Sequence, residues 1–544
     1  MILAAHSLAG MLSPEILLLI GAVVLLVGGL ARRPEWRFPV AALIVIVAAF
    51  VSAIRLGADQ LDASTPSEFT AGPLVFYVRL VTLALGILIV LANRHVPIDG
   101  ERGEFFSLIL VSLAGITTVA LANNLVLLFL ALELTSVPTY ILIALSRRDL
   151  RAQEATGKYF FLGAFAAALT LYGFSFLYGA AGTMQMYGAA ASQTSVHAAL
   201  TASGAMADTF VILGLVLTLA GLSFKIAAVP LHFYVADVYQ GAAAPVAGLL
   251  GFVPKFAGFV ALIRVFGLCD WSYASPDAAA VGHDALFWLL WVLAALTMTL
   301  GNTLALLQHN VKRLLAYSSI AHSGYMLVAL VAGVGLVKAV SPGALPGGLA
   351  ALFFYAAVYG VMNLGAFAAV AFFRKPGPDD ADDSVEMLDD LAGAAQRHPW
   401  ASLALAVCIL GLMGFPLTAG FLGKFYIFSA AFAAGAPPSA FAEPGAAAGA
   451  ARQTAMVALV VIGVINAAVG AAYYLRVLGT CYLRRPAAGI IPSRCWGLKI
   501  SMALCALIVL LLFFLPGLLF SRSKAAAGPQ PPSAANVVVP RPPR

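Results

Sequence analysis

The chain has 544 residues, of which 62% are hydrophobic and only 10% are charged. Soluble domains of this size carry far more charge, so the composition excludes that class and predicts an all-α polytopic protein in a lipid bilayer. The formal net charge of +7 does not indicate nucleic-acid binding, because the basic residues are scattered between apolar blocks.

Apolar blocks of roughly 20 residues, the length that crosses a bilayer, predict about fourteen transmembrane helices. Prolines follow the seventh block and interrupt the twelfth, so we expect these two helices to be broken. The blocks lie near residues 14–30, 38–56, 74–93, 104–122, 124–145, 157–180, 209–229, 243–267, 286–308, 313–336, 348–373, 400–432, 454–478 and 499–520.

The loop charges predict an orientation for these helices. Arg32 and Arg33 follow the first block, which therefore has the pattern of a span with its N-terminus outside and not of a signal peptide. Later odd-numbered blocks, except the seventh, are also followed by Lys or Arg. By the positive-inside rule, both termini lie outside the cytoplasm. The loops without any Lys or Arg are 57–73, 181–207, 268–285 and 433–451.

Three segments differ in composition from the predicted bundle. The acidic loop 376–399 is expected to hold a short surface helix from about Ser384, whose hydroxyl suits an N-cap. The Ala/Gly/Pro run 434–451 is typical of a flexible outer loop. The tail 521–544 is rich in Pro and Ala without a period, which predicts disorder.

The sequence lacks the usual cofactor motifs. Its five cysteines form no Cys-x-x-Cys pair and no metal-ligand spacing, which argues against zinc and iron–sulfur sites. No glycine-rich turn of the Rossmann or P-loop type is recognisable. We therefore expect no cofactor-binding and no metal-binding residues on this chain.

The stretch 221–264 combines apolar residues with ionisable ones and with prolines. Lys225 precedes Pro230 by about a turn and a half, and Lys255 directly follows Pro254. Broken backbone at membrane depth has to line protein or water, because lipid cannot satisfy its polar groups. A lysine beside such a break is typical of an ion pathway.

Two further charges fall inside predicted spans. Glu133 has about ten apolar residues on either side, which places it near mid-depth, and Lys424 follows Pro416 in the broken twelfth block. A carboxylate at that depth costs roughly 2.5–3.5 kcal/mol, so Glu133 is expected to pair with Lys225. The alternative is that this pair only holds two helices together.

Lysine suits proton transfer once it is buried. Free lysine has a pKa near 10.4, but burial disfavours the charged form by several pKa units. A neighbouring glutamate favours the charged form again. Making and breaking the pair of Glu133 and Lys225 would therefore protonate and deprotonate the lysine. Lys255 and Lys424 are candidates for the same proton uptake and release.

Three further residues are candidates for a supporting role. His232 lies just past Pro230, and His322 lies among hydroxyl residues in LLAYSSIAHSGYML, so both are candidate proton relays. The alternative for each histidine is a satisfied packing residue. Lys158 stands near the cytoplasmic end of its span. A side chain that extends to the membrane interface explains this lysine almost as well as a role in proton transfer does.

The chain resembles the antiporter-like membrane subunits of proton-pumping NADH:quinone oxidoreductase, respiratory complex I. The resemblance rests on LELTSVPTY, EATGKYFFLGAFAAALTLYG, SFKIAAVPLHFYVADVYQGAAAPV, VPKFAGF, NTLALLQHNVKRLLAYSSIAHSGYMLVAL, VYGVMNLGAFA and GFPLTAGFLGKFYIF. These motifs occur in the family's order over roughly residues 14–515. The wording of LELTSVP and VYQGAAAPV favours subunit N.

The resemblance implies a domain organisation. It implies a fourteen-helix fold with two inverted five-helix repeats, at 104–267 (helices 4–8) and 268–485 (helices 9–13). An N-terminal three-helix segment, 1–103, precedes them, and helix 14 in 486–520 follows. The added loop 434–451 and the tail 521–544 depart from the family pattern, which puts assembly contacts in question.

The resemblance also implies roles for the buried charges. Glu133 and Lys225 match the charged pair of one half-channel, Lys255 the central relay and Lys424 the residue of the other half-channel. Lys158 and His232 match family positions as well. In this family NADH, FMN, the iron–sulfur clusters and quinone belong to other subunits. The implied partners are subunits K and M, and the implied location is the bacterial plasma (inner) membrane with both termini periplasmic.

Two rival functions share many of these features. A subunit of a multi-subunit cation/proton antiporter would have the same fold and lysines and would need no redox partner. A structural scaffold of the membrane arm would move no protons itself, so neutralising Lys225 or Lys424 would leave the pumping stoichiometry unchanged.

Overall fold

The computed structural model describes eleven ranges of the chain. They are residues 8–30, 37–57, 68–96, 100–188, 194–201, 208–269, 281–333, 347–376, 382–434, 446–486 and 489–528.

Twelve of the described helices are long and apolar enough to cross a membrane. In hydrocarbon a helix satisfies its own backbone hydrogen bonds, which is why long apolar runs adopt this form. The twelve are α2 (Ser13–Leu30), α3 (Arg37–Leu56), α4 (Pro73–Ala92), α5 (Arg102–Leu121), α6 (Leu125–Ser146), α7 (Leu150–Ala181), α11 (Ala244–Phe266), α12 (Val281–Leu306), α13 (Val311–Gly333), α14 (Gly348–Phe372), α18 (Ala446–Leu483) and α19 (Trp496–Phe514).

Both helices that were expected to be broken are broken. The seventh predicted span, 209–229, is helical as α9 (Thr209–Lys225) and ends at Lys225; the short α10 (Val235–Gly241) follows after Pro230. The twelfth divides into α16 (Pro399–Met413) and α17 (Ala419–Ala434), with Gly414 in the left-handed region at φ 83°. The count of fourteen crossings stays a prediction.

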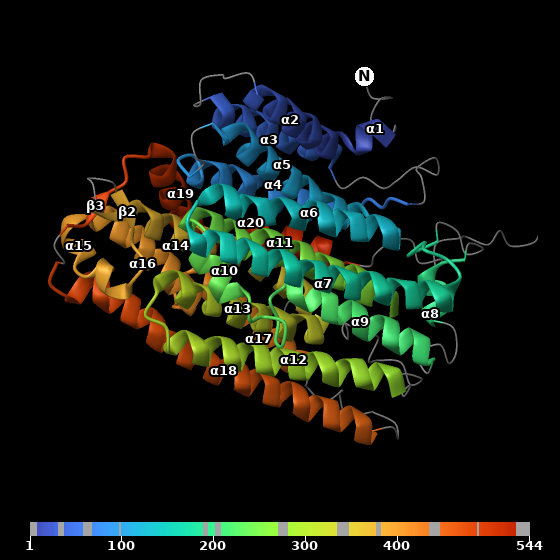
Figure 1. The fold of residues 1–544 in the computed structure, drawn as a ribbon. Helices are drawn as coiled ribbons and strands as arrows, with labels where there is room; N and C mark the ends of the chain where they lie inside the picture. Colours follow the sequence, from blue (N-terminus) through green and yellow to red (C-terminus); the bar gives the residue numbers. More distant parts are fainter. Residues whose placement is uncertain are drawn as a thin grey trace, which may run out of the picture.

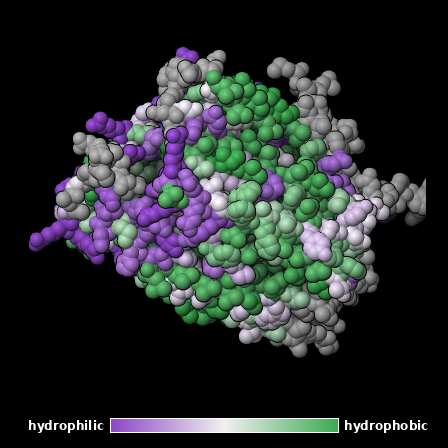
Figure 2. Space-filling model, in the orientation of Figure 1, coloured by the Kyte–Doolittle hydropathy of each residue, from purple (hydrophilic) through white to green (hydrophobic). Residues whose placement is uncertain are grey.

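The helices form a bundle around α11 (Figure 1). The apolar part of α11 is completely buried, and α13 and α14, which both contact it, are 94% buried. The helices α2, α3, α12, α18 and α19 are less than two-fifths buried and expose apolar side chains such as Val24 and Ile44. Figure 2 shows the resulting hydrophobic side of the molecule, which suits contact with lipid.

Polar residues gather at one end of the bundle, where a small sheet lies (Figures 1 and 2). Its strands are β1 (Phe373–Pro376), β2 (Asp382–Ser384) and β3 (Ile491–Pro492), in the antiparallel order β2-β1-β3. Arg374 pairs with both Ser384 and Ile491. The strands follow odd-numbered predicted spans, so this sheet end is the predicted cytoplasmic end. The all-α prediction did not include the sheet.

Three expectations for the connecting segments are corrected. Ser384 ends β2 and does not cap a helix, because the acidic loop pairs with β1; the helical turns come later, at η4 (Leu388–Leu391) and α15 (Ala394–Arg397). The run 434–451 is not wholly a loop, since α18 begins at Ala446. The tail begins as helix α20 (Gly517–Ala526), and its expected disorder beyond residue 528 lies outside the described residues. Alanine's high helix propensity favours the early start of α18, which begins AAAGAA. The remaining short elements are α1 (Leu8–Met11), α8 (Val196–Thr201) and η2 (Gly267–Cys269).

Candidate functional site

The expected ion pair between Glu133 and Lys225 is present. The Lys225 Nζ donates hydrogen bonds to Glu133 Oε1 at 3.0 Å and to Ser136 Oγ at 2.7 Å. Ser136 follows Glu133 by three residues, so both side chains lie on one face of α6. The Lys225 side chain is 4% exposed and that of Glu133 is 23% exposed. The lysine is therefore interior, and the carboxylate lies at the edge of the bundle.

The break after Lys225 brings this residue against the central helix α11. Gly258 of α11 permits the approach, because a Cβ at that position would lie 2.7 Å from Ile226 Cγ2 and 3.1 Å from Lys225 Cβ. A broken helix leaves carbonyl groups without helical donors. The Phe224 carbonyl, next to the end of α9, accepts hydrogen bonds from the Ala227 N–H at 3.0 Å and from the Tyr234 hydroxyl at 2.8 Å. The gap in the helix is thus stabilised by a side chain from the same broken segment.

Lys255 lies on α11 beside the same break, and its hydrogen-bond partners among the described residues are neutral. Its Nζ donates to the Ser319 carbonyl and to Ser323 Oγ, the latter at 2.9 Å, and the side chain is buried. Ser323 in turn donates to the Ile226 carbonyl in the break. Both serines belong to α13, so Lys255 joins α11, α13 and the broken helix.

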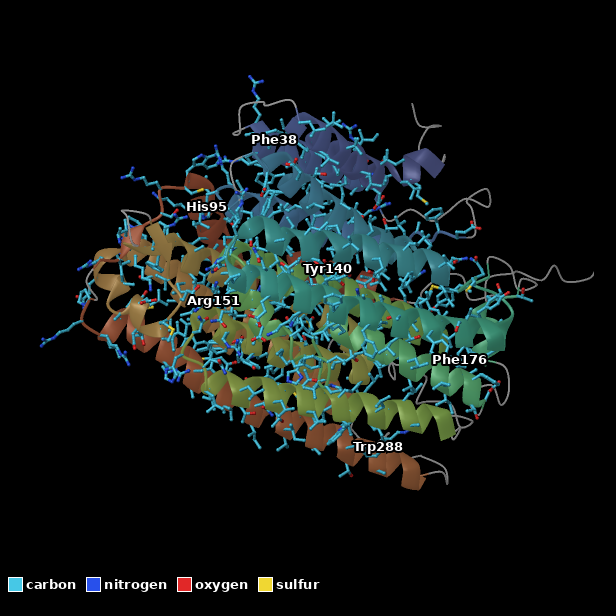
Figure 3. All side chains as sticks on the ribbon, in the orientation of Figure 1. Phe38, His95, Tyr140, Arg151, Phe176 and Trp288 are labelled. Atoms are coloured by element: carbon cyan, nitrogen blue, oxygen red, sulfur yellow. The ribbon has the colours of Figure 1, made fainter. Side chains whose placement is uncertain are left out.

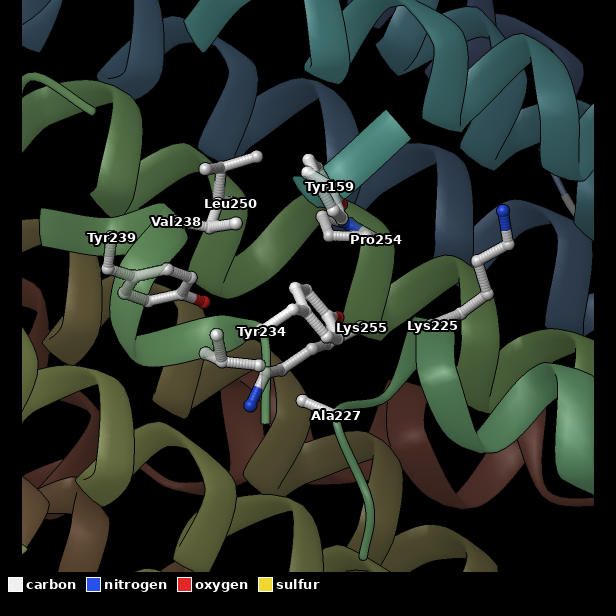
Figure 4. Close-up of a pocket in the computed structure, with 10 residues that line it drawn as sticks. Tyr159, Lys225, Ala227, Tyr234, Val238, Tyr239, Leu250, Pro254 and Lys255 are labelled. Carbon is white, nitrogen blue, oxygen red and sulfur yellow. The ribbon is translucent and has the colours of Figure 1, made fainter. Parts of the chain in front are cut away.

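A small void separates the side chains of Lys225 and Lys255 (Figure 4). Its volume is about 10 Å³, close to the smallest space that holds one water molecule, about 10–15 Å³. Figure 4 shows the two amines pointing away from each other and the Tyr239 hydroxyl pointing into the void. That hydroxyl lies 3.4 Å from Ser319 Oγ, next to Lys255. Lys225 and Lys255 therefore line the same void, but their ammonium groups do not contact each other.

His322 lies deeper in the bundle, between two tyrosine hydroxyls. Its Nδ1 is 2.6 Å from Tyr355 OH and its Nε2 is 2.9 Å from Tyr474 OH. Tyr474 also bonds to Ser318 Oγ, and the Tyr359 ring lies 5.0 Å from the His322 ring. Lys255 Nζ lies 5.9 Å from the centre of the Tyr359 ring. The histidine thus has hydrogen-bonding partners on both nitrogens, as a relay requires.

Lys424 lies in the first turns of α17, where it folds back onto the end of α16. Its Nζ donates to the carbonyls of Leu412 and Met413, each at 3.0 Å. These carbonyls belong to the last turn of α16, whose negative dipole end favours a cation. The Lys424 Nζ also lies 4.8 Å from the centre of the Tyr325 ring. Each break thus has a buried lysine beside it: Lys225 is the last residue of α9, and the Lys424 ammonium lies against the last turn of α16.

Side chains of three helices connect the histidine cluster with Lys424. Asn302 Nδ2 donates to Tyr325 OH at 3.2 Å, and Tyr473 OH donates to Asn302 Oδ1 at 3.1 Å. The Tyr473 ring lies 4.4 Å from that of Tyr474, the partner of His322. Polar groups therefore extend from Glu133 to Lys424 across the middle of the bundle.

Lys158 and His232 lie apart from this row. Lys158 Nζ forms ion pairs with Glu154 at 2.6 Å and Asp237 at 2.9 Å, and its side chain is 41% exposed. His232 is partly exposed, and its Nδ1 lies 3.3 Å from the carbonyl of Pro230. The supporting relay roles of these two residues stay predictions, without a contact to the buried lysines that would carry them.

The three buried lysines differ in their counter-charges. Among the described residues, Lys225 forms an ion pair with a carboxylate, whereas Lys255 and Lys424 have only neutral hydrogen-bond partners. A buried ammonium without a counter-charge is costly, which distinguishes Lys255 and Lys424 from Lys225. In the same described ranges, no three His, Cys, Asp or Glu side chains gather as a metal site would require.

Sequence reasoning missed most of the hydroxyl groups in this row. Ser136 and Ser323 were detectable in principle, because each is close in sequence to a candidate residue on the same helix. Ser136 lies three positions after Glu133, and Ser323 directly follows His322. Tyr355 and Tyr474 were not, because their only signal is their contact with His322, 33 and 152 residues away. Serine and tyrosine are also common in membrane helices without such a role.

A bundle of apolar helices with two breaks, each beside a buried lysine, is typical of an ion-translocating membrane protein. Comparisons with known proteins specify the family. Residues 122–443, more than half of the chain, match the family described as NADH:quinone oxidoreductase/Mrp antiporter, TM. NADH-quinone oxidoreductase subunit N of Trichlorobacter lovleyi is 34% identical over 474 residues, which cover 87% of each chain.

Solved structures agree with this assignment. A chain of respiratory complex I from Thermus thermophilus with bound aureothin is 29% identical, with a TM-score of 0.71 over 95% of this chain and 100% of that one. A chain of the Mrp complex from Dietzia sp. shares the fold alone, at 19% identity and a TM-score of 0.75 over 95% of this chain and 96% of that one. The protein belongs to the family of NADH:quinone oxidoreductase and Mrp antiporter membrane subunits, and the resemblance found in its motifs is confirmed.

Proposed function

We propose that this chain is the proton-translocating subunit N of the membrane arm of NADH:quinone oxidoreductase. The observation that carries the proposal is the row of buried lysines at the two helix breaks, joined by hydroxyl and imidazole groups. The relatives named subunit N support the assignment of this chain to NADH:quinone oxidoreductase, because they match it over most of its length. NADH, FMN, the iron–sulfur clusters and quinone are assigned to partner subunits.

The proposed transfer begins at the pair of Glu133 and Lys225. While the pair is closed, the ammonium of Lys225 is held toward α6 and away from the void beside Lys255. When the pair opens, the ammonium turns to the void and releases one proton to a water there, which leaves a neutral amine. The neutral amine of Lys255 takes up that proton, so charge is conserved in each step. The electrostatic switch thus needs no redox chemistry on this chain.

The second half of the route runs through His322. One ring nitrogen accepts a proton while the other releases one to a tyrosine hydroxyl or a water, which passes it toward Lys424. The carbonyls of Leu412 and Met413 stabilise the ammonium of Lys424 without neutralising it. This lysine therefore holds its proton less firmly than one paired with a carboxylate, which suits release.

A partner subunit is proposed at the outer face of α6. Val126, Leu130, Val137 and Ile141 share this face with Glu133, and each of the four is between 41% and 57% exposed. A carboxylate 23% exposed at mid-depth would be costly against lipid. Packing of another membrane subunit against this face removes the cost and lets that subunit influence the ion pair. We assign this contact to subunit K and assign subunit M to another side of the bundle.

The proposal includes the two inverted repeats, at 104–267 and 268–485. In support, each half contains one broken helix and one lysine held at the break, Lys225 in the first and Lys424 in the second. The proposed location is the bacterial inner membrane, with the sheet end in the cytoplasm and both termini on the periplasmic side. The basic residues of the odd-numbered loops support this orientation.

NADH-driven proton pumping by inverted membrane vesicles tests the function. Vesicles from cells that lack this chain should show no NADH-driven gradient, and restoring the chain should restore the gradient equally in sodium-free buffer. The fold shared with the Mrp complex makes a cation/proton antiporter the second candidate. Sodium-dependent proton exchange without NADH-driven pumping, in vesicles with the chain present, would establish that candidate instead.

A further inference from the structure

The small void beside Lys225 needs a further hydrogen-bonding group if it is to connect this lysine with Lys255. Its volume of about 10 Å³ is close to the space of about 10–15 Å³ that a single water needs. A continuous chain of waters therefore does not fit between the two lysines. A side chain has to supply the next step of proton transfer.

The void lies near the middle of the bundle. Tyr159, which lines the void, packs edge-on against Tyr140, with ring centres 4.6 Å apart. Figure 3 shows Tyr140 between Arg151, near the sheet end, and Phe176, toward the opposite end. Because this depth is far from the water at either end of the bundle, protons have to pass through groups of the protein.

Two tyrosines of the segment after the break, Tyr234 and Tyr239, line the void and are buried (Figure 4). The Tyr234 hydroxyl donates to the Phe224 carbonyl, and a carbonyl accepts hydrogen bonds but has no proton to pass on. The Tyr239 hydroxyl contacts Ser319 Oγ, and a serine hydroxyl both accepts and donates. Tyr239 is thus placed to carry a proton further, whereas the hydrogen bond of Tyr234 ends at a carbonyl.

Tyr239 and Lys255 meet at the same residue of α13. The Tyr239 hydroxyl lies 3.4 Å from Ser319 Oγ, and the Lys255 Nζ donates to the carbonyl of Ser319. The distance of 3.4 Å exceeds the usual O–H···O distance of about 2.8 Å, so a small rotation of the side chain has to close it. Contacts of proton-transfer groups often tighten only when the reaction occurs.

The short helix α10, which carries Tyr239, is held in place at its C-terminal end. Lys312 Nζ donates to the Gln240 carbonyl at 2.6 Å, and Arg313 donates to the Gln240 side chain at 3.0 Å. The Tyr239 ring is 3% exposed and packs edge-on against Phe367, with ring centres 5.8 Å apart. These contacts fix both the helix and the ring, so the hydroxyl stays within reach of Ser319.

We propose that the Tyr239 hydroxyl is a proton relay between the void beside Lys225 and Lys255; the inference rests on the proposed function. A water in the void, protonated by Lys225, gives its extra proton to the Tyr239 oxygen, and Tyr239 passes its original hydroxyl proton to Ser319 Oγ. Ser319 in turn gives its own hydroxyl proton to the neutral amine of Lys255. Each hydroxyl gains one proton and loses one, so the net transfer is one proton from the water to Lys255.

Tyr239→Phe tests the proposal in inverted membrane vesicles with NADH as the only energy source. The change removes the hydroxyl and keeps the ring, so α10 should remain packed. NADH oxidation and the proton gradient, normalised to the assembled complex, should both fall about ten-fold, because a positioned proton-transfer group contributes roughly 10²–10⁴-fold and a water replaces part of it. The ratio of the rates in H₂O and D₂O should rise, since proton transfer then limits turnover, whereas a purely structural loss would leave this ratio unchanged.

Two further variants accompany Tyr239→Phe. Ser319→Ala removes the next hydroxyl of the relay but keeps the main-chain carbonyl that holds Lys255, so it should reproduce both effects and decides the proposal if Tyr239→Phe fails to assemble. Tyr77→Phe is the matched control, because Tyr77 is 1% exposed and its hydroxyl donates to the Phe353 carbonyl at 2.7 Å, outside the row of buried lysines. This control should leave the rates per complex and the isotope ratio unchanged.

Lys225→Ala separates failure of the relay from failure of the proposed function. Slow pumping in Lys225→Ala, with wild-type rates and isotope ratios in Tyr239→Phe and Ser319→Ala, would overturn the relay and leave the proposed function standing. Wild-type pumping in Lys225→Ala would overturn both, because the relay then has no proton to carry. Slow pumping in Tyr239→Phe with an unchanged isotope ratio would also overturn the relay, in favour of a packing role for the hydroxyl.

Discussion

Glu133→Gln removes the negative charge from the pair with Lys225 and preserves the size of the side chain. Two unit charges 3.0 Å apart attract each other by about 5 kcal/mol at an effective dielectric constant of about 20. The carboxylate is 23% exposed, so water screens part of this attraction. We therefore expect Glu133→Gln to remove about 3 kcal/mol of favourable interaction with Lys225, which is the lower end of the range for breaking a buried ion pair.

This free energy acts on the balance between charged and neutral Lys225. About 3 kcal/mol corresponds to roughly a hundred-fold change in that equilibrium, in favour of the neutral amine. The lysine is then rarely loaded, and proton transfer slows. Because the redox step is coupled to proton movement, NADH oxidation should fall several-fold together with the proton gradient in inverted vesicles. Glu133→Asp keeps the charge and should retain part of both activities.

The control for Glu133→Gln is a buried ion pair outside the route. Glu15 and Arg79 lie 2.8 Å apart, with side chains 6% and 5% exposed, and join α2 to α4. Glu15→Gln should lower the stability or the amount of the complex but leave the activity per assembled complex unchanged. Wild-type rates of NADH oxidation and pumping in Glu133→Gln would refute the switch. A loss of activity per complex in both variants would point to a general packing effect.

Further predictions concern the second half of the route and the sheet end. Lys424→Ala removes the proton carrier at the α16–α17 break, so pumping should fall while the amount of assembled complex, measured on native gels, stays within about two-fold; unchanged pumping would exclude Lys424 from the route. His322→Ala and His322→Gln both remove the ring that carries the proton, so pumping should slow in both, although glutamine keeps a hydrogen-bonding group; pumping retained in His322→Gln but not in His322→Ala would show that His322 only holds the tyrosine hydroxyls in place. His95 is neutral when folded and has a pKa of about 4, against about 6.5 when unfolded, so its contribution to stability is fully present above pH 6.5 and is lost as the pH falls toward 4. At pH 5 the loss is about 2 kcal/mol, and thermal melting should show a smaller acid destabilisation in His95→Gln than in the wild type; identical pH profiles would contradict a buried neutral ring.

The spans, the two breaks and the main ion pair were predictable from the sequence for simple physical reasons. Length and hydropathy determine which blocks can cross a bilayer, and proline removes a helical hydrogen bond wherever it occurs. Glu133 and Lys225 were expected to pair because an isolated charge at mid-depth is too costly. Each of these inferences depends on local composition or on a single large energy.

The neutral part of the site could not be predicted in the same way. The contacts of His322 with Tyr355 and Tyr474 depend on how three helices pack, and no local pattern reports that packing. The small sheet at Arg374 joins segments that are more than 100 residues apart in the chain. The helical start at Ala446 shows that a composition typical of loops can still form helix when alanine dominates.

The most direct test of the account is the Lys225→Ala variant in inverted membrane vesicles, with NADH as the only energy source. NADH oxidation and the proton gradient are measured together and normalised to the assembled complex. The account predicts that both fall in parallel, because a blocked proton step holds back the coupled redox step. If NADH oxidation and protons pumped per electron both stay at wild-type levels, Lys225 is a packing charge and the proposed route through this subunit is wrong.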